Sequence, residues 1–125
     1  MTPTLTPVLI IDDDTDHCFL LEHLLMLEDI PAVAVHSLEA ALYHLQHYPT
    51  RQVILDNQLP DGRGSDFLKT IFQIDPSVQV IFATADTTRG LKQRMISQGA
   101  SAFFSKPYDH RLLVKSLQQD TRQLC

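Results

Sequence analysis

The chain has 125 residues, enough for one domain with its own hydrophobic core, and we expect a single domain spanning residues 1–125. Its net charge of −5, with no Lys/Arg cluster along any segment, argues against direct contact with nucleic acid. No apolar run approaches the roughly 20 residues that span a bilayer, and no secretory signal pattern is present, so we expect a cytoplasmic protein without membrane contact. Cys18 and Cys125 have neither disulfide nor metal-site spacing, and we expect free thiols.

Short apolar runs alternate with amphipathic segments along the whole chain. The first run follows Pro7, and the helix after it repeats leucines at helical spacing, with Asp14, Thr15 or Asp16 as its cap. Ser37 opens the second helix. A turn-rich linker, 60–64, precedes the third. The predicted strands are 8–11, 32–35, 53–55, 78–82 and 102–104, and the predicted helices are 16–29, 37–47, one carrying 67–72, one containing 91–98, and 109–119.

This succession of βα units predicts the fold class. Crossovers through helices place the strands in parallel and cover both faces of the sheet. We therefore predict an α/β protein with a flavodoxin-like (βα)5 doubly wound parallel sheet and strand order 2-1-3-4-5. In such sheets, ligands bind beyond the carboxyl ends of the strands.

Reactive side chains follow four of the predicted strands. Asp12 and Asp13 follow the first strand, Asp56 the third, Thr84 the fourth and Lys106 the fifth. Each alone is commonly a cap, a turn residue or a solvated charge, and their joint occurrence is what points to chemistry. The carboxylates suit Mg²⁺, which would let Asp56 attack a phosphoryl group and form an aspartyl phosphate. Thr84 and Lys106 would then meet the phosphoryl oxygens.

Four segments resemble the receiver domain of two-component response regulators. VLIIDDD, VILDNQLPDGRG, VIFATAD and ASAFFSKP stand where that family carries its acidic pocket, phosphorylation site, hydroxyl and lysine. The resemblance covers nearly the whole chain, including the cis-prone Lys106–Pro107 bond. It implies that Asp56 is the phosphoacceptor, receiving a phosphoryl group from a phosphohistidine on a sensor histidine kinase or histidine phosphotransfer protein.

The resemblance also assigns the other site residues. Asp12 and Asp13 would be metal carboxylates, together with Asp56 and the main-chain carbonyl of Gln58. Thr84 and Lys106 of the family pattern would contact the phosphoryl oxygens. The cofactor implied is Mg²⁺.

Family members switch through a hydroxyl residue and an aromatic residue, which here would be Thr84 and Phe103. Phe103 lacks the hydroxyl of the tyrosine often found there, so only packing can set its rotamer; two ordinary core phenylalanines, with Phe104 facing the opposite side, are the alternative. We expect Gln58 and Asp86 to influence how long the phosphoryl group persists, but neither residue predicts that lifetime.

Two surfaces are expected to meet partners. His17 and Cys18 begin a helix that family members use to dock the phosphodonor. The output face is expected on the fourth helix, fifth strand and fifth helix, with partly exposed side chains at 91, 95, and 112 or 113. Three possibilities are left open: a stand-alone receiver that acts on an output partner by protein contact, a phosphorelay intermediate, and a receiver from a longer regulator whose effector domain lies outside this sequence. A phosphorylation-dependent homodimer is also possible.

Three alternatives compete with this function. A phosphohydrolase with an aspartate nucleophile would want a second acid where Gln58 stands, so we expect no metabolic enzyme. A flavin or nucleotide carrier would want glycines or hydroxyls where the acids lie. The third alternative is a phosphate-independent, receiver-like scaffold for protein–protein interaction.

Overall fold

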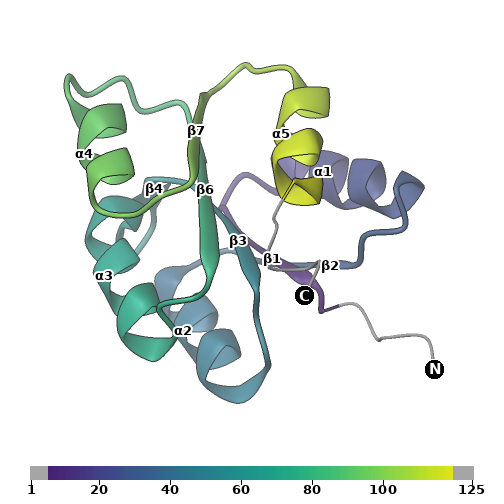
Figure 1. The fold of residues 1–125 in the computed structure, drawn as a ribbon, viewed down its shortest axis with the longest axis horizontal. Helices are drawn as coiled ribbons and strands as arrows, with labels where there is room; N and C mark the ends of the chain where they lie inside the picture. Colours follow the sequence, from purple (N-terminus) through teal and green to yellow (C-terminus); the bar gives the residue numbers. More distant parts are fainter. Residues whose placement is uncertain (1–5, 120–125) are drawn as a thin grey trace.

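A five-stranded parallel sheet forms the centre of the computed structural model, which describes residues 6–119 (Figure 1). Its strands run in the order β2-β1-β3-β6-β7, which is the predicted order 2-1-3-4-5 of the main strands. The flavodoxin-like fold class is therefore confirmed. The strands are β1 (Val8–Ile11), β2 (Ala32–Val35), β3 (Gln52–Leu55), β6 (Gln79–Thr84) and β7 (Ala102–Ser105), and the helices are α1 (Thr15–Leu27), α2 (Leu38–His47), α3 (Gly64–Ile74), α4 (Leu91–Ser97) and α5 (His110–Gln118).

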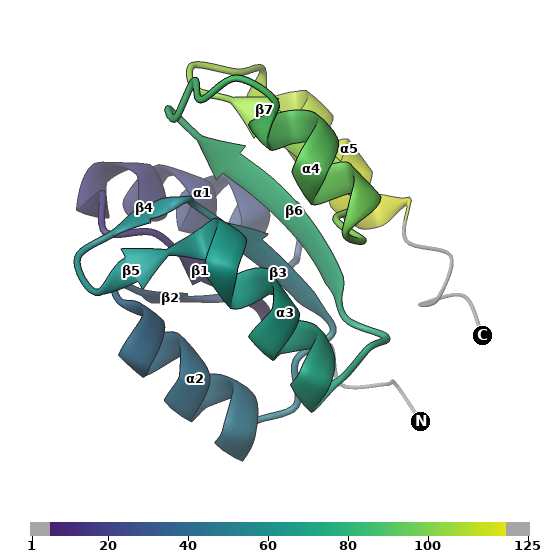
Figure 2. The same ribbon diagram turned by 90° about the vertical axis from the view of Figure 1, so that its left-hand side faces the viewer.

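The helices cover both faces of the sheet, with α1 and α5 on one side and α2, α3 and α4 on the other (Figures 1 and 2). Alternation along β1 shows how the strands serve both layers. Leu9 and Ile11 pack toward α2 and α3, whereas Val8 and Ile10 pack toward α1 and α5. Because every residue of β1 is buried, its sequence is a continuous apolar run rather than an alternating one.

Short polar side chains begin three of the helices. The Asp14 carboxylate accepts hydrogen bonds from the first turn of α1, Ser37 accepts from Ala40 N–H in α2, and Asp109 caps α5. Asp61 adds a cap from a distant turn, because its two carboxylate oxygens accept from the N–H groups of residues 38 and 39 at 2.8 and 2.9 Å. These caps fix the helix starts beside the strand ends, where the site lies.

Most of the described strands and helices match the predicted ones to within one or two residues at their ends, and two differences bear on the site. β6 continues through Thr84, because Thr84 pairs in register with Ser105 of β7. The linker expected over 60–64 includes part of an antiparallel hairpin of β4 (Gln58–Leu59) and β5 (Gly62–Arg63), visible in Figure 2. Two paired residues per strand give no alternating pattern in the sequence, so the hairpin was not predicted.

The expectation that Leu91 and Met95 are partly exposed is wrong. They are only 2% and 1% exposed, because α4 turns them into the core beneath β6. The exposed apolar side chains of this region are Ile96 and Leu112, at 42% and 55%.

Cys18 is a free and buried cysteine, as predicted, whereas Cys125 lies outside the described residues. Burial, with the negative charge of Asp12 nearby, raises the pKa of Cys18 to about 12. Its thiol is therefore protonated at neutral pH and donates to the Asp12 carbonyl at 3.2 Å. Among residues 6–119, no helix combines the length and apolar character needed to cross a bilayer.

Candidate functional site

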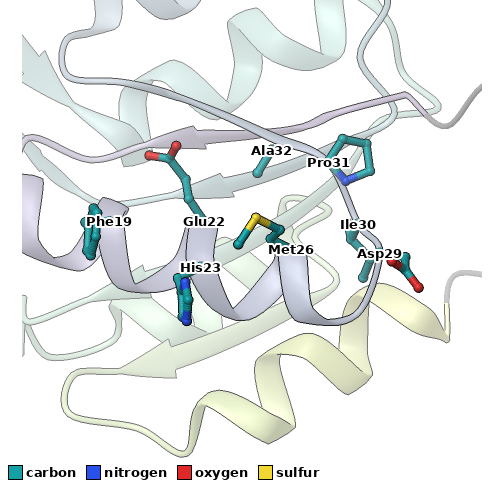
Figure 3. Close-up of a pocket in the computed structure, with 8 residues that line it drawn as sticks. All are labelled: Phe19, Glu22, His23, Met26, Asp29, Ile30, Pro31 and Ala32. Carbon is teal, nitrogen blue, oxygen red and sulfur yellow. The ribbon is translucent and has the colours of Figure 1, made fainter.

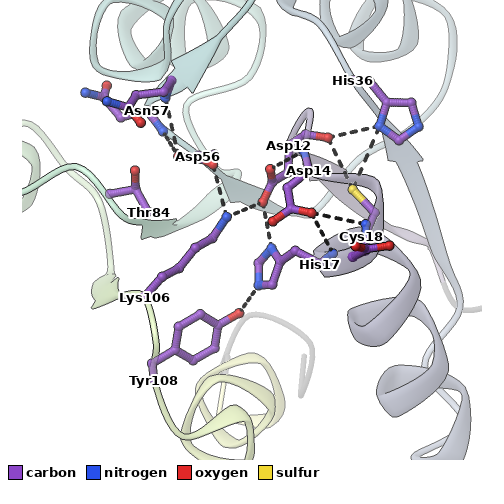
Figure 4. Close-up of polar contacts among 12 residues, drawn as sticks. Asp12, Asp14, His17, Cys18, His36, Asp56, Asn57, Thr84, Lys106 and Tyr108 are labelled. Carbon is purple, nitrogen blue, oxygen red and sulfur yellow. Dashed lines mark hydrogen bonds and ion pairs between the residues drawn. The ribbon is translucent and has the colours of Figure 1, made fainter.

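The reactive side chains predicted from the sequence lie at one edge of the sheet. Asp12 and Asp13 follow β1, Asp56 follows β3, Thr84 ends β6, and Lys106 follows β7. Because parallel strands all end at the same edge, four distant chain segments deliver these groups to one place (Figure 4).

Three carboxylates form the acidic part of this edge. One oxygen from each of Asp12, Asp13 and Asp56 lies within 4.8 Å of the others. Asp12 and Asp56 are buried, at 2% and 6% exposure, while Asp13 faces solvent. Hard oxygen donors on one exposed and two buried side chains suit Mg²⁺, which takes few carboxylates and keeps several waters. The residues present therefore fit the implied cation.

Lys106 bridges the two buried carboxylates. Its Nζ donates to Asp12 Oδ2 at 2.8 Å and to Asp56 Oδ2 at 3.1 Å (Figure 4). Burial alone would lower the pKa of Lys106, but the hydrogen bond and charge of Asp12, with those of Asp56, raise it above the usual value. The ammonium therefore stays charged and offsets the repulsion between the acids. The Lys106–Pro107 peptide bond is cis.

Asp12 stays ionised in spite of its burial. Burial by itself would raise its pKa, but hydrogen bonds from His17, Lys106 and the Asp14 N–H outweigh it and hold the pKa at about 2. Three donors thus fix both carboxylate oxygens, since Oδ1 accepts from Asp14 N–H at 2.9 Å and Oδ2 accepts from the two side chains.

Asp56 is held by the chain that follows it. Its Oδ1 accepts from the N–H groups of Asn57 and Gln58 at 2.6 and 3.3 Å, so Oδ1 and Oδ2 have different partners. Gly64 makes this turn tight, because a Cβ there would collide with the backbone carbonyl oxygen of Asp56. The side-chain oxygen of Asn57 accepts from Ser65 N–H at 2.7 Å, which ties the start of α3 to the same turn.

Thr84 is fully buried, and the loop after it holds its hydroxyl. Thr84 Oγ1 accepts from the Asp86 N–H at 3.1 Å. The Asp86 carboxylate accepts from the Asn57 side chain at 2.6 Å, and bonds from Thr88 and Asn57 lower the pKa of Asp86. Asp86 thereby links the loop after β6 to the turn after Asp56.

Phe103 is half-buried on β7 and stacks on Phe82 of β6, with ring centroids 5.8 Å apart. Phe103 also lines a groove with Ser105 and residues 86–88 and 90–93. Phe104 packs in the cluster on the opposite face of the sheet, as predicted.

His17 extends the site in a direction that the sequence did not reveal. Its Nδ1 lies 2.6 Å from Asp12 Oδ2, and its Nε2 lies 2.6 Å from the hydroxyl of Tyr108 (Figure 4). The sequence places His17 only on a docking helix and predicts no role for Tyr108 or Asn57. Asn57 could have been identified from the sequence, because it is a small polar residue directly after Asp56. The His17–Tyr108 contact could not, because it joins residues 91 positions apart and leaves no local pattern.

An apolar groove runs along the outer side of α1. Phe19, His23 and Met26 project from the helix toward solvent, and the groove continues onto the connection to β2 through Ile30 and Ala32 (Figure 3). Phe19 and Met26 are 75% and 61% exposed. Large exposed apolar side chains on one helix are typical of a contact surface.

The fold and the site at the edge of the sheet together define a class of protein. It is a doubly wound α/β domain with an acidic pocket that suits a cation and a lysine that binds two of the carboxylates. Comparisons with known proteins agree. The response regulator receiver domain family matches residues 8–118. The chain belongs to this family, which makes it a signalling receiver domain and not a metabolic enzyme.

Individual relatives show the extent of the likeness. The sensory transduction protein RegX3 of Mycobacterium tuberculosis is 31% identical over 119 residues, covering 95% of this chain and 52% of RegX3. A CheY-like receiver domain protein from Methanospirillum hungatei JF-1 shares the fold, with a TM-score of 0.88, 22% identity and 96% coverage of both chains. The beryllofluoride-activated NtrC4 receiver domain, solved as a dimer, matches with a TM-score of 0.82 and 26% identity, covering 90% of this chain and 93% of that chain. The chain spans 25% to 52% of the length of the curated relatives it matches.

Proposed function

We propose that this chain is a phosphoacceptor receiver domain in which Asp56 accepts a phosphoryl group from a partner phosphohistidine. The observation that carries the proposal is the placement of Lys106 between Asp12 and Asp56 beside a third carboxylate. In the transfer, the P–N bond to the partner imidazole breaks and a P–O bond to the Asp56 carboxylate forms. Lys106, already charged and within reach, would stabilise the phosphoryl oxygens.

The carboxylates of Asp12, Asp13 and Asp56, with the main-chain carbonyl of Gln58, would hold Mg²⁺. When bound, the cation would neutralise the incoming phosphoryl oxygens and reduce the repulsion among the acids. Asp12 contributes because its low pKa keeps it ionised, and therefore able to bind a cation, throughout the neutral range.

Thr84 and Phe103 are the proposed switch residues. The Thr84 hydroxyl is bound to the Asp86 N–H, so a move toward a phosphoryl group on Asp56 would pull on the loop that leads into α4. Phe103 borders a groove beside that loop and is only half-buried, which leaves it room to change rotamer. Phosphorylation would thereby bias the face formed by α4, β7 and α5 between two arrangements.

The partner proposed for the groove on α1 is the phosphodonor, a sensor histidine kinase or histidine phosphotransfer protein. Its support is the exposure of Phe19 and Met26 on the helix that begins beside the acidic pocket. We propose that residues 1–125 act as one receiver unit in the cytoplasm, without direct contact with nucleic acid. The output is proposed to pass to a protein partner, to an effector domain in a longer protein, or to a second copy of the chain, as in the activated NtrC4 dimer.

The proposal is tested by labelling with acetyl phosphate in Mg²⁺, followed by peptide mass spectrometry. The native chain should be modified on the peptide that contains Asp56, and Asp56→Asn should not be modified. Asp66→Asn, which changes an exposed carboxylate on α3, is the matched control and should be labelled like the native chain. Labelling that persists in Asp56→Asn would contradict the phosphoacceptor assignment. A native chain that is never labelled would favour the phosphate-independent scaffold.

A further inference from the structure

The imidazole of His17 occupies a position between the acidic pocket and the loop that joins β7 to α5. It is 9% exposed, and both of its ring nitrogens have partners within 2.6 Å. Ionised Asp12 can only accept hydrogen bonds, so the Nδ1 of His17 must donate to it. In the neutral imidazole, Nε2 then accepts from the Tyr108 hydroxyl. The imidazole therefore joins Tyr108 to Asp12 through its two ring nitrogens.

Tyr108 connects this chain of bonds to the elements on the output side. Its ring contacts Phe104 of β7 with centroids 5.5 Å apart and His110, the first residue of α5, with centroids 4.8 Å apart. Burial and the nearby negative charges of Asp12 and Asp56 raise the pKa of Tyr108, so its hydroxyl keeps its proton. The hydroxyl thus stays a neutral hydrogen-bond partner of His17, on a ring that packs against both β7 and α5.

We propose that His17 is a positioning residue that orients the Asp12 carboxylate for Mg²⁺ and couples its state to Tyr108 on the β7–α5 loop. This inference rests on the proposed function, because it takes Asp12 to be a metal carboxylate. Hydrogen-bond partners of ligating carboxylates fix ligand orientation, and their loss typically weakens metal affinity about 10- to 100-fold. His17 and Lys106 both donate to Asp12 Oδ2, but only Lys106 also contacts Asp56.

The link differs from the one through Lys106 in the element that it reaches. Lys106 joins the two carboxylates to the end of β7, where its backbone N–H also binds the Thr84 carbonyl at 2.8 Å. His17 instead reaches past the lysine to the start of α5. Binding of Mg²⁺ in the pocket would therefore change the surroundings of the start of α5 before any phosphoryl group is present.

The first test follows the tyrosines during a Mg²⁺ titration without a phosphoryl donor. The chain has three tyrosines, and Tyr43 and Tyr48 are exposed on or beside α2, so they serve as internal controls for ring-labelled NMR. Saturable shifts at Tyr108, with the same midpoint as the amides of Asp13 and Asp56 and none at the controls, are the expected result. Amide shifts without a Tyr108 response would overturn the inference while leaving the metal pocket intact.

The second test is a double-mutant cycle on the Mg²⁺ dissociation constant. His17→Leu should weaken binding about tenfold. Tyr108→Phe, which removes only the hydroxyl, should weaken it about threefold, as expected for one ordinary hydrogen bond. In the His17→Leu background, Tyr108→Phe should have no further effect, because Tyr108 reaches Asp12 only through the imidazole.

Tyr43→Phe is the matched control, since Tyr43 also contacts a histidine, His47, but on the surface of α2. It should leave the dissociation constant unchanged. A Tyr108→Phe effect of equal size with and without His17 would contradict the proposed link, as would unaltered affinity in His17→Leu. If the native chain bound no Mg²⁺, both the pocket and this inference would be wrong, whereas failure of acetyl phosphate labelling alone would leave these measurements valid.

Discussion

Replacing Lys106 with methionine should make the stability of the fold depend more strongly on Mg²⁺. The substitution keeps the length and most of the apolar stem of the side chain but removes the charge that lies 2.8 Å from Asp12 and 3.1 Å from Asp56. Both carboxylates are at most 8% exposed, so their buried charges would lose the cation that they share and keep only their other hydrogen-bond donors. Removing one partner of a buried ion pair typically costs about 3–5 kcal/mol. Because the lysine side chain is itself 17% exposed, we expect the lower end, about 3 kcal/mol.

Urea unfolding measures this loss, once with a chelator and once with saturating Mg²⁺. A cation present at about 100 times its dissociation constant stabilises the folded chain by about 2.7 kcal/mol. It also supplies positive charge to the same carboxylates, so the loss caused by Lys106→Met should be smaller in Mg²⁺ than in chelator. Lys69→Met, at an exposed site on α3, should change stability by less than about 0.5 kcal/mol. An equal loss for Lys106→Met in both conditions would refute the idea that lysine and cation neutralise the same acids.

Three further changes test other parts of the structure. Gly64→Ala should destabilise the chain by about 2 kcal/mol or more in urea unfolding, because the new Cβ collides with the Asp56 carbonyl, whereas Gly90→Ala has open space and should show only the cost of its positive φ, about 1 kcal/mol. Phe19→Ser should slow phosphoryl transfer from the histidine partner but not labelling by acetyl phosphate, and equal slowing of both would contradict docking on α1. Since the pKa of Asp12 falls from 3.8 to about 2 on folding, its contribution is present above pH 3.8 and is lost as the pH falls through about 2. Without Mg²⁺, Asp12→Asn should therefore remove about 2 kcal/mol of this pH-dependent stability. If the free energy of unfolding depended on pH as in the native chain, Asp12 would not be the carboxylate responsible.

The parts of the fold that sequence predicted well are those set by local patterns. β1 and β2 begin and end where expected, because each is a short apolar run rich in valine or isoleucine with polar or turn residues after it. The acidic edge followed from topology, since each reactive residue lies at or just after the end of a strand and parallel strands share one edge. The close placement of Asp12, Asp56 and Lys106 could therefore be predicted without knowing which atoms are in contact.

The features that sequence missed are set by tertiary contacts. Leu91 and Met95 were expected at the surface, yet a helix of only seven residues gives too little periodicity to show which side meets the core. The bond between His17 and Tyr108 depends on how α1 and the loop before α5 pack together on the same side of the sheet. Neither residue stands at the end of a strand, so the rule that found the pocket could not find this link.

A beryllofluoride titration in Mg²⁺, followed by backbone NMR, tests the central claim most directly, because beryllofluoride with an aspartate stands in for the aspartyl phosphate. The native chain should show saturable shifts that extend from Asp56 to Thr84, Phe103 and α4, and Asp56→Asn should show none. Shifts confined to the pocket would contradict the proposed switch. Equal shifts in Asp56→Asn, or none in the native chain, would contradict the role of Asp56 as the phosphoacceptor.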